Sequence, residues 1–494
     1  MNFSGSILLT GITGSLGSVI AQRVLAEGYR VKALVRGQNH NIAAARAKRT
    51  LEIINASYND NNLEVIKGDI CENNSGIVHE KLSGVSLIIH CAALLDFSDD
   101  SNQKSHLINV NGTENILKLA ESHNIPLCHI STAYIAGKRQ GIVKENELNV
   151  GQEFHNYYEK SKAHAEQLIQ DWSQRTGLPV MIFRPSILVG DSKAGKIVNF
   201  DGLYNLLRFF DNAADLIRKQ EFRAVANPNT TKNFIPIDIA SKMIWEIIKS
   251  NKAGTYHITN PKPISLARLR EIFVELFDIP LTRFVDEEDF KRNKSSRYEL
   301  MYKKISSLYT PYLCEEPVFD RTFTDQIISG SEFEIPELNL DFFRTVLDYA
   351  RSQQWGQYRN DAIQQSISSY TSIVEDYFNR FLVDKMHKQL LPDLKNLTAN
   401  CRISVSEIPL KSWFLEIENG RLENISLNGF KSQCSYLTDS NTFEKIVKGK
   451  LAPQQAFFRK KIDIKGNIET GLKLATVLAA FFRKYPYELG EKNG

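Results

Sequence analysis

Long apolar runs are rare in this chain of 494 residues. The longest nearly apolar stretch covers residues 474–482, whereas a helix that crosses a bilayer needs roughly 20 such residues. The N-terminus has no basic start and no small-residue cleavage site before its first apolar run, so we expect no signal peptide. We therefore expect no transmembrane segment and a cytoplasmic location. A function at a membrane surface is compatible with both expectations.

Cysteine is also scarce, and an excess of one sign of charge is absent. The six cysteines show no Cys-x-x-Cys spacing, which argues against a zinc site or a disulfide scaffold, and we predict no metal site. The net charge is +4, from 61 Lys and Arg against 57 Asp and Glu, so nucleic acid is not an expected partner. The length predicts two or three domains.

Short apolar runs rich in β-branched residues alternate with helical stretches in the first half of the chain. We expect strands at residues 6–11, 30–36, 63–69, 86–93, 126–132, 179–185 and 255–261. The helical stretches between them include residues 17–28, 113–123, 157–176 and 238–250. This alternation predicts a Rossmann-type α/β fold, that is, a doubly wound parallel sheet, with a smaller substrate-binding part.

The pattern changes twice towards the C-terminus. Residues 286–365 begin with a charged helical stretch and end with an amphipathic helix at 341–355, with a loop at 329–337 between them. A long helix at 368–395 is followed by alternating runs and a final apolar helix, at 401–408, 412–420, 421–429, 433–440, 461–467 and 469–485. We predict a nucleotide-binding domain at 1–285, a helical extension, substrate cap and linker at 286–365, and an antiparallel α+β domain at 366–494.

A glycine-rich turn follows the first expected strand and opens the first helix. Gly11, Gly14 and Gly17 have the spacing G-x-x-G-x-x-G, one residue longer than the common dinucleotide fingerprint. Glycine permits positive φ and a close approach of pyrophosphate, and the N–H groups of the helix N-terminus attract its charge. We expect this turn to bind a dinucleotide, and a turn without a ligand is the alternative. The predicted contacts also include Thr13, Ser15 and Leu16.

The residues after the second and third strands indicate which nucleotide binds. A carboxylate after the second strand would hold the ribose 2′-OH of NAD, but this chain has Arg36 there, which suits a 2′-phosphate. NADP, with NADPH as its reduced form, is therefore favoured over NAD, and Arg46 is a second contact. After the third strand, Asp69 is placed to meet the adenine, next to Ile70.

Small and hydroxyl-bearing residues follow the fourth and fifth strands. Ala92 and Ala93 leave room for the backbone to pass close to a cofactor, and plain packing is the alternative interpretation. Ser131 and Thr132 end the fifth strand at the carboxyl edge of the sheet, where ligands bind in open α/β folds. A hydroxyl at that edge can hydrogen-bond a substrate carbonyl oxygen.

The helix expected at 157–176 begins with two tyrosines and two lysines. Tyr158 and Lys162 are four residues apart and share one face, whereas Tyr157 and Lys160 point elsewhere and are interpreted as packing and surface groups. An ammonium beside a phenol favours the ionised phenol, so we expect Lys162 to lower the pKa of Tyr158 and make it a usable proton donor. Taken alone, this spacing is common on amphipathic helices.

Together, the glycine turn, the hydroxyl at Thr132 and the Tyr158–Lys162 pair resemble the extended short-chain dehydrogenase/reductase family. The likeness extends over residues 6–285 and is greatest to thioester reductases, the terminal domains of carboxylic acid reductases, and fatty acyl-CoA reductases. The stretches that carry it are LLTGITGSLG, ALVRG, HCAALLDFS, NVNGTENILKLA, HISTAYIAG, YYEKSKAHAEQLI, FRPSILVGDSKAGK and NFIPIDIASKMI.

This resemblance implies a catalytic role for three residues. Tyr158 would donate the proton, Lys162 would hold the nicotinamide ribose, and Thr132, with Ser131 as runner-up, would hold the carbonyl oxygen. The implied reaction is an NADPH-dependent reduction of an acyl thioester, on coenzyme A or an acyl-carrier protein. Its product would be an aldehyde and, after a second hydride, an alcohol.

The C-terminal part resembles a second family, the sterol carrier protein 2-type domains, which are small α+β folds with a lipid tunnel. The likeness is carried by VKGKLAPQQAFFRKKIDIKGNIETGLKLATVLAAFF, residues 447–482. In this stretch only Lys473 and Thr476 interrupt the apolar surface of helix 470–482, so we expect nearly all of it to be buried or to face lipid. The domain would then bind a lipid and present its acyl chain to the reductase. A structural core helix in a domain without a ligand is the alternative.

Three other functions stay open at this point. Sterol or steroid dehydrogenases of the 3β-hydroxysteroid type share the fold and the catalytic trio, and a sterol-carrier domain would suit one. Arg36 speaks against that alternative, since such enzymes often use NAD. A sugar-nucleotide epimerase fits poorly with an appended apolar domain, and a lipid-binding scaffold without turnover conflicts with the intact trio.

Overall fold

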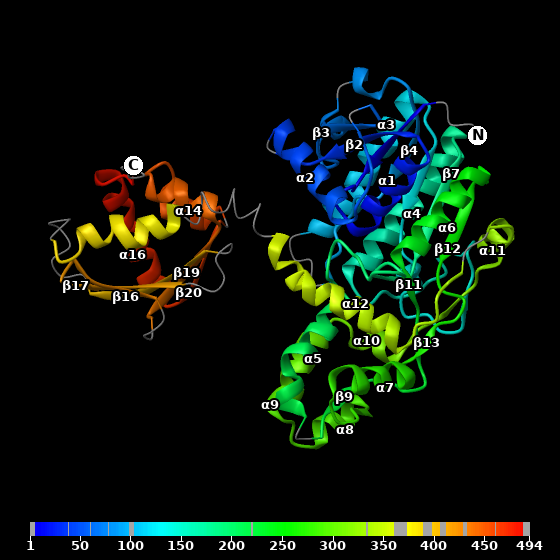
Figure 1. Ribbon diagram of the computed structural model, residues 1–494. Helices are drawn as coiled ribbons and strands as arrows, with labels where there is room; N and C mark the ends of the chain where they lie inside the picture. Colours follow the sequence, from blue (N-terminus) through cyan, green and yellow to red (C-terminus); the bar gives the residue numbers. More distant parts are fainter. Residues whose placement is uncertain are drawn as a thin grey trace. The chain divides into compact units, whose positions relative to one another are not determined.

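Figure 1 presents the fold of the chain as a computed structural model. The structure describes residues 5–37, 39–59, 61–77, 79–97, 103–218, 221–331, 334–359, 373–388, 398–405, 412–427, 432–459 and 461–487. The chain divides into two compact units, Met1–Gly356 and Gln357–Gly494. The predicted boundary between residues 365 and 366 lies outside the described residues, and the boundary at 285 stays a prediction.

Seven parallel strands form the central sheet of the first unit, and all seven lie in the runs where the sequence predicts them (Figure 1). Their order in the sheet is β12-β7-β5-β4-β1-β2-β3. The strands are β1 Ser6–Thr10, β2 Arg30–Val35, β3 Leu63–Lys67, β4 Val85–His90, β5 Leu127–Ile130, β7 Val180–Pro185 and β12 Gly254–Ile258. Every residue of β1, β5 and β7 is buried, as a sheet covered on both faces requires, and the predicted fold class is confirmed.

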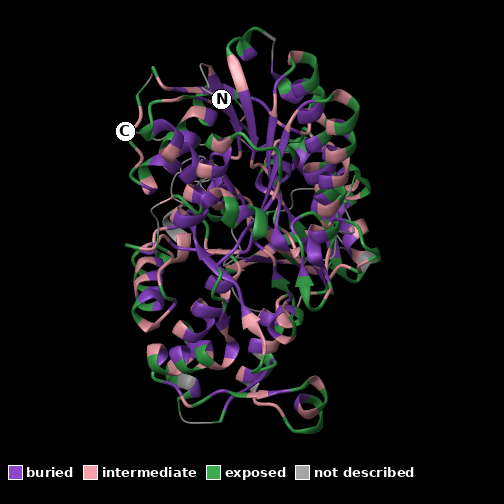
Figure 2. Ribbon diagram, turned by 90° about the vertical axis from the view of Figure 1, so that its right-hand side faces the viewer, coloured by how far each residue is buried: buried purple, intermediate pink, exposed green. Residues whose placement is uncertain are grey.

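Helices cover both faces of this sheet, so that its strands are buried and the outer helical surfaces are exposed (Figure 2). One face packs against α1 Ser15–Ala26, α2 His40–Ile53 and α6 Ile237–Ser250, and the other against α3 Gly112–His123 and α4 Tyr157–Thr176. The strand order reverses between β1 and β4. At such a switch point the loops diverge and leave room for a ligand.

The helix α4 is held at its start, its middle and its end. The Asn156 side chain accepts a hydrogen bond from the Glu159 N–H at 3.0 Å, and Gly177 ends the helix with φ +71°. In the middle, the buried Glu166 carboxylate contacts Arg184 of β7 at 2.7 Å. Removing one partner of a buried pair leaves an uncompensated charge, so this contact fixes where α4 lies against the sheet.

A smaller helical part completes the first unit. Its main elements are α5 Leu203–Ile217, α7 Leu266–Phe277, α8 Glu287–Arg292, α9 Arg297–Ser306, α10 Thr310–Cys314, α11 Thr322–Ile328 and α12 Leu340–Ser352. Short strands connect them: β6 Ile142–Val143, β8 Ile187–Val189, β9 Arg223–Val225, β10 Thr231–Lys232, β11 Phe234–Pro236, β13 Ile264–Ser265, β14 Arg283–Val285 and β15 Val318–Phe319. The ring of Phe210 lies 5.9, 5.6 and 5.7 Å from those of Phe222, Phe273 and Tyr302, so aromatic packing forms this core.

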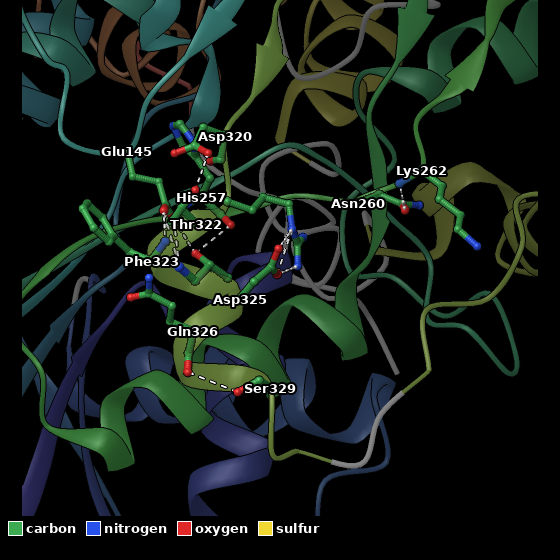
Figure 3. Close-up of polar contacts among 12 residues, drawn as sticks. Glu145, His257, Asn260, Lys262, Asp320, Thr322, Phe323, Asp325, Gln326 and Ser329 are labelled. Carbon is green, nitrogen blue, oxygen red and sulfur yellow. Dashed lines mark hydrogen bonds and ion pairs between the residues drawn. The ribbon is translucent and has the colours of Figure 1, made fainter.

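A buried carboxylate fastens the helical extension to the sheet. Figure 3 shows Glu145 facing the start of α11. It accepts hydrogen bonds from the Phe323 N–H at 2.6 Å, the Thr324 hydroxyl at 2.5 Å and the His257 N–H of β12 at 2.9 Å. Burial raises the pKa of Glu145, and these donors oppose the rise. The predicted cap segment is thus part of the first unit's packed structure.

The second unit contains a five-stranded sheet in the order β18-β17-β16-β19-β20. Its elements are β16 Ala399–Val405, β17 Ser412–Glu418, β18 Arg421–Leu427, β19 Cys434–Thr438, β20 Ile462–Gly466, α14 Ser440–Val447, α15 Pro453–Phe458 and α16 Ile468–Lys484. Phe378 stacks on Trp413 at 4.5 Å in its core. The α+β class is confirmed, but the sheet is mixed rather than antiparallel, because β16 and β19 pair in parallel.

Two helix predictions in this unit need correction. The helix predicted at 368–395 does not extend that far: helical turns end at Lys385, and His387 has φ +58°, while residues 368–372 and 389–395 lie outside the described part. The final helix is exposed at Ala480 in addition to the two predicted interruptions, Lys473 and Thr476, and Lys473 contacts Glu469 at 2.7 Å. Among the described residues, none of the helices combines the length and apolar character that crossing a membrane requires.

Candidate active site

The glycine turn between β1 and α1 is tightly packed against the loop that follows β4. Gly11 has φ +78°, and a Cβ atom there would lie 2.6 Å from the Ala92 nitrogen. A Cβ atom on Gly17 would lie 2.2 Å from the Gly11 oxygen. Gly14 is less constrained, since its Cβ would meet that oxygen at 3.3 Å. The first and third glycines are therefore required by close backbone approach.

The start of α1 fits a pyrophosphate. The N-cap residue is Gly14, and no side chain caps the first N–H groups of the helix. These groups carry the positive end of the helix dipole. The Ser15 hydroxyl accepts the Asn199 N–H at 2.9 Å, and the Leu16 side chain is buried in the core, so both residues would offer mainly backbone to a ligand. Thr13 lies half-buried in the same turn.

A hydroxyl that the sequence reasoning missed joins β1 to β4 beneath this turn. The Thr10 Oγ1 accepts the Cys91 and Ala92 N–H groups at 3.1 and 3.0 Å and donates to His90 Nδ1 at 2.8 Å. Burial lowers the pKa of His90 to about 3, so its imidazole is neutral. Its other nitrogen, Nε2, then donates to the Thr113 hydroxyl at 3.1 Å. This network sets the spacing of the two strand ends at the switch point.

Two arginines meet after β2, as a 2′-phosphate site would need. Arg46 of α2 donates through Nη1 to the Arg36 carbonyl oxygen, and both side chains are exposed. Burial and the charge of Arg36 lower the pKa of Arg46. Asp69 accepts the Cys71 N–H at 3.0 Å, and the charges of both Asp69 and Arg36 act on the Cys71 thiol. The three predicted contacts are therefore close together at one edge.

Two residues predicted to contact the cofactor have a buried or a small side chain. Ile70 is buried, and its side chain would lie 2.8 Å from a Cβ atom on Gly112, so it packs against α3. Its carbonyl oxygen accepts a hydrogen bond from the Asn115 side chain at 2.8 Å. Ala93 is exposed next to the half-buried Ala92.

The three residues predicted to be catalytic lie at the carboxyl edge of β5. The Thr132 side chain is close enough to the Tyr158 hydroxyl to act on its pKa, and Thr132 Oγ1 accepts the Tyr134 N–H at 3.3 Å. Lys162 is 2% exposed, and its Nζ donates to the Ile130 oxygen at 2.5 Å and approaches His129 Nε2 at 3.3 Å. The runner-up, Ser131, is buried next to Thr132, and its hydroxyl has no partner among the described residues.

The effect expected of Lys162 on Tyr158 is absent. Burial raises the pKa of Tyr158, with further rises from Cys91 and Glu159, and the Thr132 hydrogen bond opposes them. The Lys162 ammonium donates to the Ile130 oxygen of β5. Burial instead lowers the pKa of Lys162 to about 8. In this structure the phenol is a protonated donor, and the lysine is the group that titrates near neutral pH.

A group of aromatic rings extends from Tyr158 to the helical extension. Phe97, from the loop after β4, lies 5.6 Å from Tyr158 between ring centroids. Tyr309 and Tyr312, from the helical extension, lie 5.7 and 5.9 Å from Phe97, and Tyr134 lies 5.4 Å from Tyr312. Such a set of rings offers an apolar contact for a long carbon chain next to a few polar groups. Sequence reasoning missed these residues, although Phe97 lies in a stretch that carries the family resemblance.

Glu159 connects the extension to the first turn of α4. It is buried and accepts hydrogen bonds from the Tyr312 hydroxyl and from the His155 N–H, the latter at 2.8 Å. Asn156 donates to the same Tyr312 hydroxyl at 2.7 Å. Burial raises the pKa of Tyr312 far above its usual range, and Glu159 adds to the rise. Tyr312 is therefore a protonated donor that holds the extension beside Tyr158.

Asn109, which sequence reasoning also missed, connects the loop after β4 to α4. It accepts the Leu94 N–H at 2.7 Å and donates to the Leu94 oxygen at 3.0 Å and to the Ser161 hydroxyl at 2.9 Å. Ser161 then donates to the Tyr158 carbonyl oxygen at 2.8 Å. This chain of hydrogen bonds positions the backbone of Tyr158 relative to the cofactor side. Tyr157 and Lys160, by contrast, are exposed.

Comparison with known proteins matches both units. Residues 9–244 match the NAD-binding domain described as Male sterility protein, and residues 378–479 match the SCP-2 sterol transfer family. The N-terminal unit contains a reductase domain of the Male sterility protein family. The C-terminal unit contains an SCP-2 domain, so both predicted resemblances are confirmed.

The curated relatives are reductases and multidomain synthetases. A nonribosomal peptide synthetase, asaC of Aspergillus flavus, is 29% identical over 52% of this chain and 26% of its own length. A carboxylic acid reductase of Segniliparus rugosus is 25% identical over 52% of this chain and 24% of its own length. Probable fatty acyl-CoA reductase 4 of Arabidopsis thaliana is 22% identical over 55% of this chain and 70% of its own. This chain thus spans about a quarter of the first two.

A solved structure supports the fold. The terminal R domain from the myxalamid PKS-NRPS pathway superposes with a TM-score of 0.59 at 22% identity, covering 71% of this chain and 91% of that chain. The first unit therefore has the fold of this reductase domain. Its family is one of NAD(P)-dependent oxidoreductases, as the sequence predicted.

The buried lysine gives a prediction about pH and stability. Lys162→Met should raise the free energy of unfolding at pH 7 by up to about 3 kcal/mol, because the folded chain then buries no charge. The pKa of Lys162 is lowered from 10.5 to about 8, so between these values only the unfolded chain keeps the proton, and wild-type stability rises with pH relative to the variant. Denaturant titrations of both proteins from pH 7 to 11 should show the difference shrinking. A difference independent of pH would contradict the assignment.

Proposed function

We propose that this chain reduces an acyl thioester with NADPH, giving an aldehyde and, in a second reduction, an alcohol. The observation that carries the proposal is the position of Thr132 and Tyr158, whose side chains interact next to the glycine turn at the switch point of the sheet. Relatives named as a carboxylic acid reductase and a fatty acyl-CoA reductase support the substrate class.

The residues present suit each part of this reaction. When bound, the reduced nicotinamide supplies a hydride to the acyl carbon. Thr132 and Tyr158 direct two hydroxyl donors at the carbonyl oxygen, where negative charge develops. Burial keeps the Tyr158 phenol protonated, so it has a proton to give to that oxygen. Lys162, held against β5, is placed to bind the ribose, and expulsion of the thiol from the hemithioacetal then leaves the aldehyde.

The proposed thiol carrier is coenzyme A or an acyl-carrier protein, and the proposed acyl group is a fatty chain. The ring cluster of Phe97, Tyr309 and Tyr312 supports an apolar acyl group near Tyr158. We further propose that the SCP-2 domain binds a lipid and supplies the acyl chain. Saturable binding of a fluorescent fatty acid or acyl-CoA to the full chain, lost on substitution within residues 378–479, would support this role.

Incubation of the full chain with NADPH and a panel of fatty acyl-CoAs and acyl-carrier proteins tests the reaction. Nicotinamide absorbance should fall with thioester, and chromatography should detect the aldehyde or alcohol. No oxidation of NADPH with any thioester would refute the proposal. The same panel contains sterols with NAD and NADP, because the match to the SCP-2 sterol transfer family favours a sterol or steroid dehydrogenase as the second candidate.

The preference for NADPH is proposed from Arg36, with Arg46 beside it. Arg36→Ala should lower kcat/KM for NADPH by about 10–100-fold, since a hydrogen bond to a charged group contributes roughly 1.5–3 kcal/mol. With NADH the value should change by less than about threefold, because no 2′-phosphate is lost. Lys48→Ala on the same helix as Arg46 is the matched control. Equal losses with both coenzymes would remove Arg36 from the phosphate site.

A further inference from the structure

A cavity that the proposed mechanism does not use lies between α4 and η3 His106–Asn111, the helical turn that leads into α3. Its volume is about 340 Å³, within the range of pockets that bind small molecules. The residues that line it include Gln103, His106, Lys160, Ser161 and His164. Because Lys160 and His164 are four residues apart, they share one face of α4, and Tyr158 and Lys162 lie on another. The cavity is therefore a separate feature of the same helix.

Three basic side chains of this cavity face one another. The ring centroids of His106 and His164 lie 5.5 Å apart. Burial lowers the pKa of His164, and the charges of His106 and Lys160 lower it further, so the three groups act on one another as like charges. No aspartate or glutamate is among the described residues that line the cavity, and none of the three side chains forms an ion pair within the described ranges. An anion between them would relieve their repulsion.

Phosphate is the anion that suits these groups. Lysine is a common ligand of phosphate, and each imidazole has an N–H group that donates to an oxygen. A phosphate group offers three oxygens to three basic groups, whereas a carboxylate offers two. A divalent metal ion would also bind imidazoles, but the Lys160 ammonium would repel it. The described part of the chain also contains no group of three residues that could hold a metal.

The position of the cavity on α4 indicates which phosphate it suits. Ser161, in the wall of the cavity, donates to the Tyr158 carbonyl oxygen at 2.8 Å. With a rise of about 1.5 Å per residue, Lys160 and His164 lie roughly 3 and 9 Å from Tyr158 along the helix axis. Coenzyme A and the prosthetic group of an acyl-carrier protein both carry the thioester on a pantetheine arm that ends in a phosphate. That phosphate must bind at a distance from the reacting carbonyl, as a ligand of this cavity would.

We propose that the cavity between η3 and α4 binds the phosphate at the end of the pantetheine arm. Lys160 supplies a positive charge, and His106 and His164 donate to phosphate oxygens. This inference rests on the proposed reduction of acyl thioesters and identifies a site for their carrier. It also gives a role to Lys160, which spacing alone assigned to the surface.

Kinetics with one acyl group on two carriers test the proposal, since acyl-CoA has the phosphate and acyl-pantetheine lacks it. Lys160→Ala and His164→Gln should each raise KM for acyl-CoA about tenfold and change kcat by less than about twofold, because the phosphate is bound equally in the ground state and the transition state. KM for acyl-pantetheine should stay at the wild-type value. Lys160→Arg keeps the charge, so its KM for acyl-CoA should stay within about threefold of the wild type.

An acyl-carrier protein with the same acyl group distinguishes the two sources of the phosphate. A rise in KM with both carriers supports a site for the phosphate that the two arms share. A rise confined to one carrier supports the site and identifies that carrier as its ligand.

Lys118→Ala is the matched control. It removes an exposed cation of the neighbouring α3 that is paired with Glu114 at 2.8 Å, and all KM values should stay at the wild-type level. Equal rises for acyl-CoA and acyl-pantetheine in Lys160→Ala, or no rise with acyl-CoA and acyl-carrier protein, would overturn the proposal. If no thioester is reduced, the proposed function fails, and calorimetric titration with coenzyme A decides the site by itself. Binding weakened about tenfold in Lys160→Ala supports the site, and equal or absent binding overturns it.

Discussion

Tyr158→Phe is expected to reduce kcat for the thioester by a factor of about 10²–10³ or more. The substitution removes one of the two donors aimed at the carbonyl oxygen, and loss of one such donor typically costs that much. It also removes the proton that this oxygen must receive, a contribution of roughly 10²–10⁴ in general acid catalysis. Binding of NADPH, measured by nicotinamide fluorescence, should change little, because the glycine turn and Arg36 are untouched.

Tyr157→Phe is the matched control, one residue away on the same helix. Its side chain is exposed on another face of α4, so turnover should stay within about twofold of the wild type. Thr132→Val should show a loss comparable to that of Tyr158→Phe, since the two hydroxyls are proposed to donate to the same carbonyl oxygen. Full turnover in Tyr158→Phe would remove this phenol from the mechanism.

Local spacing was sufficient to propose Thr132, Tyr158 and Lys162 as a group, because four residues on a helix and the end of a strand are short-range relations. The direction of the Tyr158 pKa was predicted wrongly for a long-range reason. Burial of the phenol is the largest cause of the raised pKa, and that burial depends on residues distant in the sequence. Tyr312 could not be found by spacing either, since it reaches Glu159 from 153 residues along the chain.

The difference between short-range and long-range relations also explains why the two sheets were predicted with different success. Buried parallel strands are continuous apolar runs, so the seven strands of the central sheet could be predicted from the sequence. In the second unit the alternation of apolar and polar residues indicated the strands, but this pattern does not specify which strands pair with each other. The parallel pairing of β16 with β19 places Cys401 opposite Cys434, a relation across the chain that no local pattern encodes.

Gly17→Ala should destabilise the first unit by about 3 kcal/mol and abolish NADPH binding. The added methyl would lie 2.2 Å from the Gly11 oxygen, a backbone atom that cannot rotate away, so the turn or α1 must shift. That shift moves the helix N-terminus that is proposed to face the pyrophosphate. Denaturant unfolding and NADPH fluorescence measure the two effects.

Gly14→Ala separates packing from binding in the same turn. Its methyl would meet the Gly11 oxygen at 3.3 Å, and Gly14 has φ −91°, which alanine adopts without strain. The stability loss should therefore be about 1 kcal/mol or less, the cost of alanine at an N-cap. NADPH affinity should still fall about tenfold or more, because a methyl at this position keeps a phosphate from the free N–H groups of α1. If Gly14→Ala binds NADPH like the wild type while Gly17→Ala only unfolds, the turn is a packing motif and the dinucleotide site lies elsewhere.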